Sequence, residues 1–256
     1  MKLGMPQLYE YEKVEDNLIL ADELGLDFVE LNLNFAYCRR EMEEGHLEAL
    51  FRKYGLEATL HFYDEGDLAT YDEVADAYLS LLQKYARLGR GYVKIINVHI
   101  ISGPVVTISG VKNYIYEKEF EDYSERLLKN LKKAEKICSE NGIALVLENT
   151  DYLAKFVKKT YKILSENNFK FNYDVGHDRV DGDFLLNEVI PELNLKFTEM
   201  HVHDSLGKKC HLAIGEGDCE LSNYKKFMDN AYVLLEVKQK SDLLLSVPRF
   251  KRIVNN

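Results

Sequence analysis

Histidines and carboxylates gather at the C-terminal ends of the predicted strands. Six of the seven histidines lie at or just after such an end, beside glutamate or aspartate residues in equivalent positions. The segments are TLHFYD, INVHI, LVLENT, FNYDVGH, EMHVHD, CHLAIGEGD and LLEV, and the residues concerned are His61, His99, Glu148, Asp174, His177, His201, His203, Asp204, His211 and Glu236. Imidazole and carboxylate groups are the ligands of zinc, manganese and similar ions. The pattern therefore predicts one metal centre built by several parallel strands.

Strand alternation puts these polar side chains on one face. Successive side chains point to opposite sides of a strand, so Glu199, His201 and His203 share a face in EMHVHD, and Glu148 shares one with Val146 in LVLENT. A barrel needs one inward face on every strand, and turning the polar face inward suits all of these strands at once. Any one of these residues alone is more often an ordinary buried residue. So many ionisable groups at one barrel mouth would be costly, however, unless they were paired or bound to a metal.

Short apolar strands alternate with amphipathic helices along the whole chain. Strands are expected at residues 2–6, 27–33, 57–63, 93–100, 144–149, 169–174, 195–202 and 232–237. Helices are expected near residues 14–24, 39–54, 68–88, 117–141, 152–166, 182–192, 222–230 and 240–253. Eight strand–helix units in 256 residues predict a single (β/α)₈ TIM barrel domain over residues 1–256. An open doubly wound sheet usually has fewer strands, and its nucleotide-binding form needs a glycine-rich turn where this chain has MPQLYEYE.

Composition and charge narrow the choice of partners. The chain has a net charge of −10 and no long run of lysine and arginine, which argues against a nucleic-acid partner. No stretch approaches the roughly 20 apolar residues of a membrane span, so no membrane partner is expected. The four cysteines show no CxxC spacing and are interpreted as reduced thiols of a cytoplasmic protein. Composition leaves the assembly state open, and a homo-oligomer is compatible with it.

The ordered set LVLENT, FNYDVGH, HVHDS, HLAIGEGD and LLEV resembles the xylose isomerase-like barrel superfamily. That superfamily contains sugar and sugar-phosphate isomerases and epimerases, and also endonuclease IV, a zinc enzyme that cuts DNA at abasic sites. The resemblance covers nearly the whole chain and implies a small carbohydrate-like substrate. It also implies four metal ligands, which are Glu148, Asp174, His201 and Glu236.

Further histidines match the additional zinc sites of endonuclease IV. His61 and His99, together with Glu148, correspond to the ligands of a second zinc. His177 and His211 correspond to two of the three ligands of a third zinc. The third ligand there is an aspartate two residues before the histidine, where this chain has Lys209. Because a cation in a ligand position opposes a metal, the resemblance supports the third zinc site least.

The leading hypothesis is an isomerase or epimerase of a small sugar, sugar phosphate or hydroxy-ketone. The metal would hold the carbonyl and adjacent hydroxyl oxygens and stabilise an enediolate as a Lewis acid. Glu148 and Glu236 come from different strands, so one would remove a proton next to the carbonyl and the other would return one. The resemblance places His177 near the carbonyl as a third catalytic residue. The residues expected to bind the rest of the substrate are His61, His99, His211 and Lys209. The lysine could equally be a solvated loop residue.

Two other functions remain open. Hydrolysis of phosphodiester bonds at abasic DNA would use two ions, which activate water and stabilise the leaving oxygen, and His61 and His99 are its main support. The acidic balance, the lack of basic stretches and the lysine near the third site count against it. A metal-binding module without turnover is the weakest alternative, because both acid–base glutamates are present. The metal itself is also open, since carboxylate-rich ligation suits manganese or magnesium and the histidines suit zinc.

Overall fold

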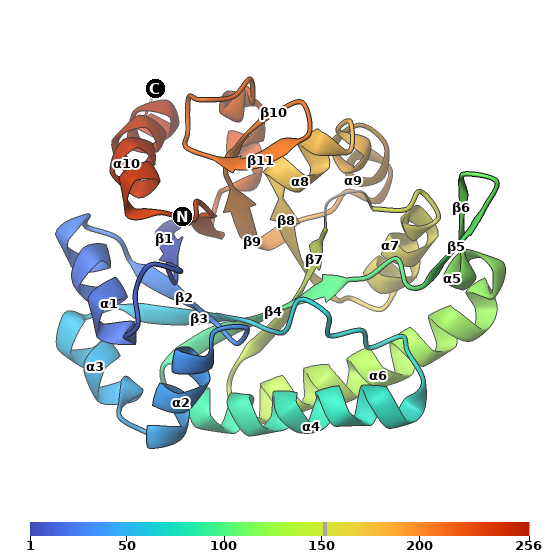
Figure 1. Ribbon diagram of the computed structural model, residues 1–256, viewed down its shortest axis with the longest axis horizontal. Coiled ribbons are helices and arrows are strands. Elements are labelled where there is room, and N and C mark those ends of the chain that lie inside the picture. The colour runs from blue at the N-terminus through green and yellow to red at the C-terminus, as the bar shows by residue number, and fades with distance from the viewer. Residues whose placement is uncertain (151–152, 256) are drawn as a thin grey trace.

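The strands form a closed parallel barrel. The computed structural model describes residues 1–150 and 153–255. Within them, eight strands follow one another around the barrel, and the last pairs with the first (Figure 1). In barrel order they are β1 Lys2–Pro6, β2 Phe28–Asn32, β3 Glu57–His61, β4 Val93–Ile100, β7 Ala144–Asn149, β8 Lys170–Asp174, β9 Phe197–Val202 and β12 Tyr232–Leu235. The predicted (β/α)₈ TIM barrel is confirmed.

Helices surround the barrel (Figure 1). They are α1 Val14–Glu23, α2 Ala36–Glu44, α3 Leu47–Tyr54, α4 Asp72–Gly89, α5 Ile115–Lys118, α6 Phe120–Glu140, α7 Val157–Glu166, α8 Val175–Val180, α9 Ile190–Leu193 and α10 Lys240–Asn255. A π-helical segment spans Leu185–Val189 and a 3₁₀ segment spans Leu221–Phe227. In the part of the chain that the structure describes, none of the helices has the length and apolar character needed to cross a membrane.

The helices depart from the predicted ranges in several places. The helix expected at 117–141 is divided into α5 and α6, the one expected at 182–192 is the π-helical segment followed by α9, and the one expected at 222–230 is the 3₁₀ segment. The helix expected at 39–54 is two helices, because Gly45 takes a left-handed φ of 78° and ends α2. The helix expected at 152–166 is observed as α7, which begins at Val157. Residue 152 lies outside the described residues.

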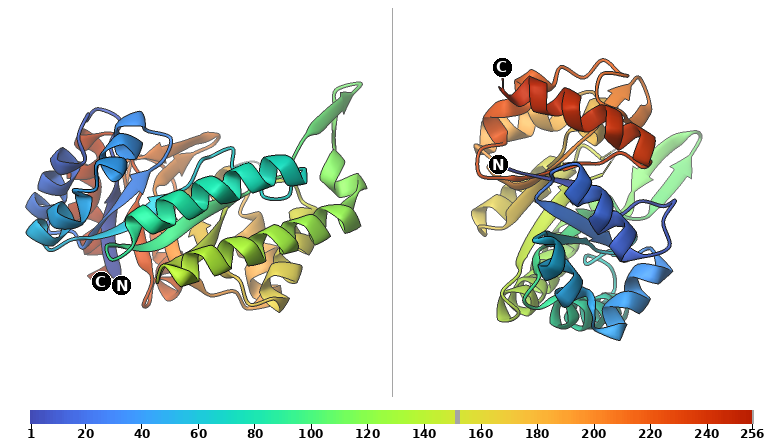
Figure 2. Two further views of the ribbon diagram at one scale, coloured as in Figure 1. Left: turned by 90° about the horizontal axis from the view of Figure 1, so that it is seen from below. Right: turned by 90° about the vertical axis from the view of Figure 1, so that its left-hand side faces the viewer.

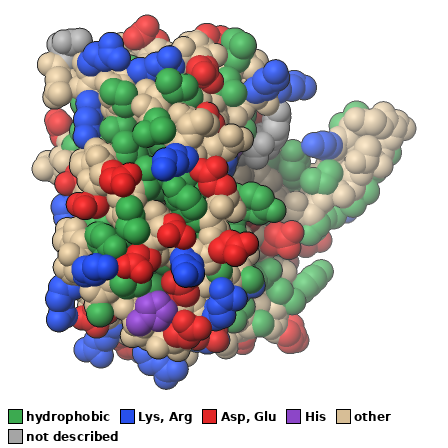
Figure 3. Space-filling view, turned by 60° about the vertical axis from the view of Figure 1, so that its left-hand side comes forward, with side chains coloured by type: hydrophobic (Ala, Val, Ile, Leu, Met, Phe, Trp, Pro, Cys, Tyr) green, Lys and Arg blue, Asp and Glu red, His purple; other side chains and the backbone are tan. Residues whose placement is uncertain are grey.

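Two antiparallel hairpins lie within the loops that follow barrel strands. The first, β5 Val105–Ile108 with β6 Val111–Tyr114, follows β4 and projects from the body of the molecule (Figures 2 and 3). Its Val106, Ile108 and Val111 side chains are 46%, 61% and 63% exposed. The second hairpin, β10 Asp204–Leu206 with β11 Lys209–Leu212, follows β9 and packs against α8.

The inward face of the barrel changes character along the strands. Near the N-terminal ends it carries buried apolar side chains, and the ring of Phe28 lies so close to β1 that a Cβ at Gly4 would be 2.5 Å from it. The next inward positions are polar and almost fully buried: Glu30, Thr59, Asn97, Asn172 and Glu199. The C-terminal mouth above them carries the predicted ligands. This order places a polar layer directly under the candidate site.

Candidate metal centre

The four predicted ligands converge at the C-terminal mouth. Glu148, Asp174 and His201 lie on the neighbouring strands β7, β8 and β9, and Glu236 follows β12 directly. Nδ1 of His201 lies 2.9 Å from Oε1 of Glu148, 3.3 Å from Oε2 of Glu236 and 4.0 Å from Oδ2 of Asp174. One donor atom from each of the four lies within 4.8 Å of all the others. The parallel register produces this convergence, since His201 pairs with Asp174 on one side and with Leu234 on the other.

The chemistry of this donor set fits a divalent cation. All four side chains are buried, and three of them are carboxylates. Oε2 of Glu236 and both ring nitrogens of His201 make no well-directed hydrogen bond to the described residues. Burying several carboxylates is costly without a compensating positive charge. A divalent ion held by three carboxylates and one imidazole supplies that charge and uses donor types common to manganese, magnesium and zinc sites.

The pKa values of Glu148, Glu236 and His201 are shifted by the charges that these residues exert on one another and by their neighbours. Burial would raise the pKa of Glu148, but its histidine neighbours, chiefly His201, hold it well below its usual value. Burial is likewise outweighed at Glu236, where Lys238 and the nearby histidines keep the pKa low. Burial would lower the pKa of His201, and the surrounding glutamates raise it well above its usual value. Both glutamates are therefore ionised at neutral pH.

His61 and His99 flank the central set on the side of β3 and β4. The Nε2 atom of each ring lies 3.6 Å from Oε2 of Glu148. The Nδ1 atoms lie against main-chain carbonyls, at 2.8 Å from the oxygen of Phe62 and 3.2 Å from that of Asp64. In a ring that donates from Nδ1 to a carbonyl, Nε2 is the nitrogen that binds an ion once it has lost its proton, which is how metal-bound histidines are usually oriented. The structure thus groups His61, His99 and Glu148 as a candidate second set of ligands.

The two rings of this pair differ in charge. Burial would lower the pKa of His61, but the contact with Glu148 and the charge of Glu30 raise it to about 10. Burial dominates at His99 and lowers its pKa. One positive charge is therefore held next to Glu148, where a cation would be equally well placed.

His177 and His211 flank the central set on the side of β8 and β9. The N–H of His177 donates to Oδ1 of Asp174 at 2.7 Å, which caps the first turn of α8. Nδ1 of His177 lies 3.3 Å from the carbonyl oxygen of Asn149, and Nδ1 of His211 lies 3.1 Å from that of Glu236. The two Nε2 atoms face each other at 3.4 Å. The sequence places these two rings at the mouth, and the structure brings them into direct contact.

His203 joins this pair, although the sequence reasoning assigned it no role. The three rings of His177, His203 and His211 form a further group whose nitrogens lie within 4.8 Å of one another. The alternation in EMHVHD had placed His203 on the inward face, so the signal for it was present. Lys209 lies exposed at the start of β11. Lys238 does reach the centre, with its Nζ 2.7 Å from Oε1 of Glu236, and the sequence analysis did not predict this.

The polar layer under the centre contacts two of the ligands. Asn97 donates from Nδ2 to Oε2 of Glu148. Oε2 of Glu30 lies 3.4 Å from Nε2 of His201 and 3.4 Å from Oγ1 of Thr59. Burial, with the charge of Glu30 beside it, raises the pKa of Glu199 to about 8. These contacts tie the ligands to the barrel interior.

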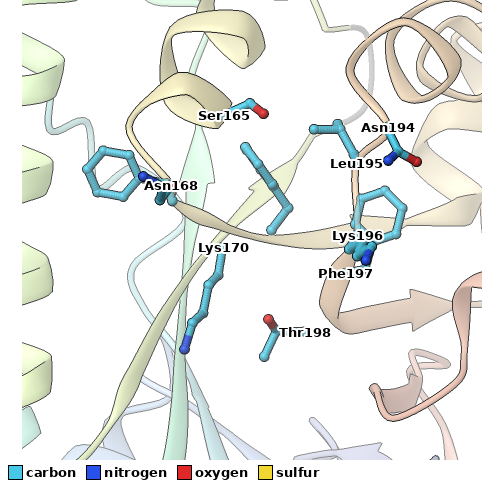
Figure 4. Close-up of a pocket in the computed structure, with 10 residues that line it drawn as sticks. Ser165, Asn168, Lys170, Asn194, Leu195, Lys196, Phe197 and Thr198 are labelled. Carbon is cyan, nitrogen blue, oxygen red and sulfur yellow. The ribbon is translucent and has the colours of Figure 1, made fainter.

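Two cavities lie at opposite ends of the barrel. One of about 370 Å³ is at the N-terminal ends of β8 and β9, around Lys170, Lys196 and Thr198 (Figure 4), and its described lining has no histidine or carboxylate. The other, of about 470 Å³, lies beside the mouth between the loops after β3 and β4, with Asp64 and Tyr114 in its wall. Active sites of TIM barrels lie at the C-terminal end of the strands. The second cavity therefore adjoins the candidate centre, and the first does not.

Comparison with known proteins agrees with this fold. Three similar solved structures are a D-tagatose 3-epimerase-like protein, a 3-keto-D-glucoside 4-epimerase from E. coli and a Thermus thermophilus protein soaked with ZnCl₂. Their identities to this chain are 18%, 13% and 18%, and their TM-scores are 0.79, 0.76 and 0.72. Each match covers 100% of this chain, and 98%, 100% and 98% of the other chain. At these identities the likeness shows the fold alone.

Sequence comparison identifies the family. A search among curated proteins found no match. The family model described as xylose isomerase-like TIM barrel matches residues 18–240, which is most of the chain. Together with the closed parallel barrel, this match shows that the chain belongs to the xylose isomerase-like TIM barrel family.

Proposed function

We propose that this protein is a divalent-metal-dependent isomerase or epimerase of a small sugar, sugar phosphate or related hydroxy-ketone. The observation that carries the proposal is the pairing of Glu148 and Glu236 across one donor set. Each approaches Nδ1 of His201 from a different strand, at 2.9 Å and 3.3 Å. The shared fold of the D-tagatose 3-epimerase-like protein and the 3-keto-D-glucoside 4-epimerase supports the substrate class. The proposed ligands are Glu148, Asp174, His201 and Glu236.

The two glutamates would carry the proton transfer. A bound divalent ion would act as a Lewis acid on the carbonyl and stabilise the negative charge of an enediolate. Glu148 and Glu236 are both held in the ionised form, so either can accept the proton next to the carbonyl. Isomerisation or epimerisation needs the proton to return at a different carbon or face. Two carboxylates on different strands suit that requirement better than one.

The flanking histidines would bind the hydroxyl groups of the substrate. His177 and His211 both turn Nε2 inward and donate from Nδ1 to the main chain. Burial would lower the pKa of His177, but the charge of Asp174 raises it to about 10, so its inward nitrogen carries a proton and can donate to a substrate oxygen. Burial lowers the pKa of His211 to about 4, so its inward nitrogen can accept from a substrate hydroxyl. His177 is proposed to lie nearest the reacting carbonyl, because its backbone N–H donates to the proposed ligand Asp174. Lys209 is exposed, and its contact with an anionic substrate group stays a prediction.

Solvent isotope exchange would test the proposal. The purified protein, loaded with manganese, would be incubated with a panel of ketopentoses and ketohexoses in D₂O. We expect deuterium to enter next to the carbonyl of at least one sugar, and Glu236→Gln to slow this exchange by on the order of 10³-fold. Glu140→Gln is the matched control, since Glu140 is exposed at the end of α6. A fully loaded protein that exchanges no proton in any of these sugars would refute the isomerase.

A second candidate is phosphodiester hydrolysis at abasic DNA. It is favoured by one observation, namely that ligand groups flank the central set on both sides, which suits a site with several ions. The net charge of −10 opposes it, and acidic and basic side chains are interspersed on the face in Figure 3. Elemental analysis separates the two functions. One manganese-like ion per chain favours the isomerase. Two or three zinc ions, with salt-sensitive cleavage of an abasic duplex, favour the hydrolase.

A further inference from the structure

His203 has both ring nitrogens engaged by other groups of the protein. Its Nδ1 lies 2.8 Å from the backbone nitrogen of His211. The carbonyl oxygen of Asp204 lies farther from Nδ1, at 3.3 Å. A backbone N–H can only donate, so Nδ1 must be the bare, accepting nitrogen and makes no hydrogen bond to that carbonyl. The ring proton is then on Nε2, which lies 3.0 Å from Oδ1 and 3.3 Å from Oδ2 of Asp174. The hydrogen bonds therefore determine the tautomer, and Nε2 donates to the carboxylate.

This tautomer is opposite to that of the four surrounding histidines. In each of those rings Nδ1 donates to a main-chain carbonyl, so the inward Nε2 is the nitrogen that can bind an ion or substrate once it has no proton. The four are His61, His99, His177 and His211. His203 instead has its lone pair occupied by an N–H and its proton directed at a carboxylate. It has no free lone pair to offer a metal unless one of these hydrogen bonds is broken.

Packing holds the ring of His203 in this orientation. The side chain is fully buried. It lies against the backbone of α8, where a Cβ at Gly176 would be 1.9 Å from its Cε1 and 2.2 Å from its Nδ1. Only a glycine leaves room for the ring at that position. The sequence FNYDVGH thus provides the carboxylate, the space and a neighbouring histidine within one turn.

The Asp174 carboxylate is consequently held by two donors. Oδ1 accepts the N–H of His177 at 2.7 Å and faces Nε2 of His203 at 3.0 Å. Oδ2 is then directed to the central set, 4.0 Å from Nδ1 of His201. The hydrogen bond from His211 links the same ring to the β10–β11 hairpin, where His211 has a left-handed φ of 56°.

We propose that His203 is a positioning residue, which orients Asp174 for metal binding and couples it to the β10–β11 hairpin, and that it is not a ligand of an ion shared with His177 and His211. The proposal rests on the proposed function in that Asp174 is taken as a metal ligand. His203 is not one of the four proposed ligands, so the proposal adds a residue that acts through one of them. It also explains the grouping of His177, His203 and His211 by hydrogen bonds of His203 in place of a shared ion.

Substitutions that retain one hydrogen bond each can test this. A glutamine nitrogen reaches roughly as far as Nε2 of histidine, so His203→Gln can still donate to Asp174. An asparagine oxygen lies near the position of Nδ1, so His203→Asn can accept from His211 but cannot reach Asp174. His203→Ala loses both. Manganese and zinc affinities would be measured by competition with a chelator, metal content by elemental analysis, and folding by thermal melting.

The expected pattern distinguishes positioning from ligation. His203→Ala and His203→Asn should bind the metal about 10- to 100-fold more weakly, as loss of a group that orients a ligand does. His203→Gln should stay within about threefold of the parent protein. If all three variants lose one ion per chain while the remaining affinity is unchanged, His203 is a ligand and the proposal is wrong. Unchanged affinity and content in all three would also overturn it.

A measurement without metal separates this proposal from the proposed function. Long-range ¹H–¹⁵N correlation spectra of the metal-free protein report which ring nitrogen of each histidine is protonated. We expect His203 to be protonated on Nε2 only, and His61 and His211 to have protonated Nδ1. A proton on Nδ1 of His203 overturns the proposal whatever the metal content. A parent protein that binds no divalent ion, with the expected tautomer, instead refutes the metal-dependent function and leaves the hydrogen-bonding role of His203 supported.

Discussion

The histidine pairs on the two sides of the centre, His61/His99 and His177/His211, have the same ring orientation but different neighbouring groups. His61 and His99 share a carboxylate, because both Nε2 atoms lie 3.6 Å from Oε2 of Glu148. His177 and His211 share none, and their Nε2 atoms face each other at 3.4 Å. Two imidazoles and a carboxylate form a ligand set that can hold an ion. The raised pKa of His177 and the lowered pKa of His211 instead leave one proton between their facing Nε2 atoms, so this pair can donate to one substrate oxygen and accept from a hydroxyl. The side of His61 and His99 is therefore suited to binding an ion, and the side of His177 and His211 is suited to binding a substrate.

Removing the shared carboxylate should have the largest effect. Glu148→Gln deletes a member of both the central set and the His61/His99 side. We expect turnover to fall on the order of 10³-fold and metal binding to weaken, while the metal-free protein still folds. Glu166→Gln, exposed at the end of α7, is the control. Full turnover in Glu148→Gln would show that the acid–base assignment is wrong.

Single histidine deletions compare the two sides directly. His99→Ala should lower the metal content by about one ion per chain if the first side holds a second ion. His211→Ala should keep the metal content and raise KM roughly tenfold, because a hydrogen bond to the substrate is lost. Elemental analysis and steady-state kinetics with the substrate identified by isotope exchange measure both. The reverse result, with metal lost only in His211→Ala, would exchange the roles given to the two sides.

A steric test applies to the second side alone. Gly176→Ala would put a methyl group 1.9 Å from the ring of His203. We expect it to reduce the free energy of unfolding by about 1–3 kcal/mol, measured by urea denaturation of the metal-free protein. In the His203→Ala background the same change should cost much less, since the ring is gone. Equal costs in both backgrounds would mean that the ring does not occupy this place.

The smallest effect is expected from a charge change near the second side. Lys209→Asp places a carboxylate two residues before His211, on the same face of β11. Zinc affinity at His177 and His211 should rise by about tenfold, with an added zinc found by elemental analysis. Lys208→Asp makes the same charge change outside the hairpin strand and should add none. An unchanged zinc count in Lys209→Asp would count against a latent third metal site.

Much of the barrel could be predicted because its signals are local. Most barrel strands are apolar runs with a polar group at or next to their C-terminal end, and each predicted range overlaps the observed strand. The parity of LVLENT and EMHVHD places Glu148 and His201 inward, and parallel pairing then brings them to one end. Convergence of the four central ligands follows from these two rules.

The rest depends on tertiary contacts that periodicity does not record. The β5–β6 hairpin has exposed apolar residues such as Ile108 and Val111, so no burial pattern marks it in the sequence. The helix break at Gly45 needs a left-handed residue in the middle of a helical pattern. The role of His203 depends on the space above Gly176 and on one N–H from a distant hairpin residue. None of these can be read from the spacing of residue types.

The carboxylate of Glu148 has one oxygen turned to each neighbour. Oε1 lies 2.9 Å from His201, and Oε2 lies between His61 and His99. An ion bound in the central set, or one bound by His61 and His99, would fix the rotation of the Glu148 carboxylate. The second of these two sites would then already be oriented for its ion. Uptake of two ions would then be cooperative, and a manganese or zinc titration should give a sigmoidal curve in place of two independent steps.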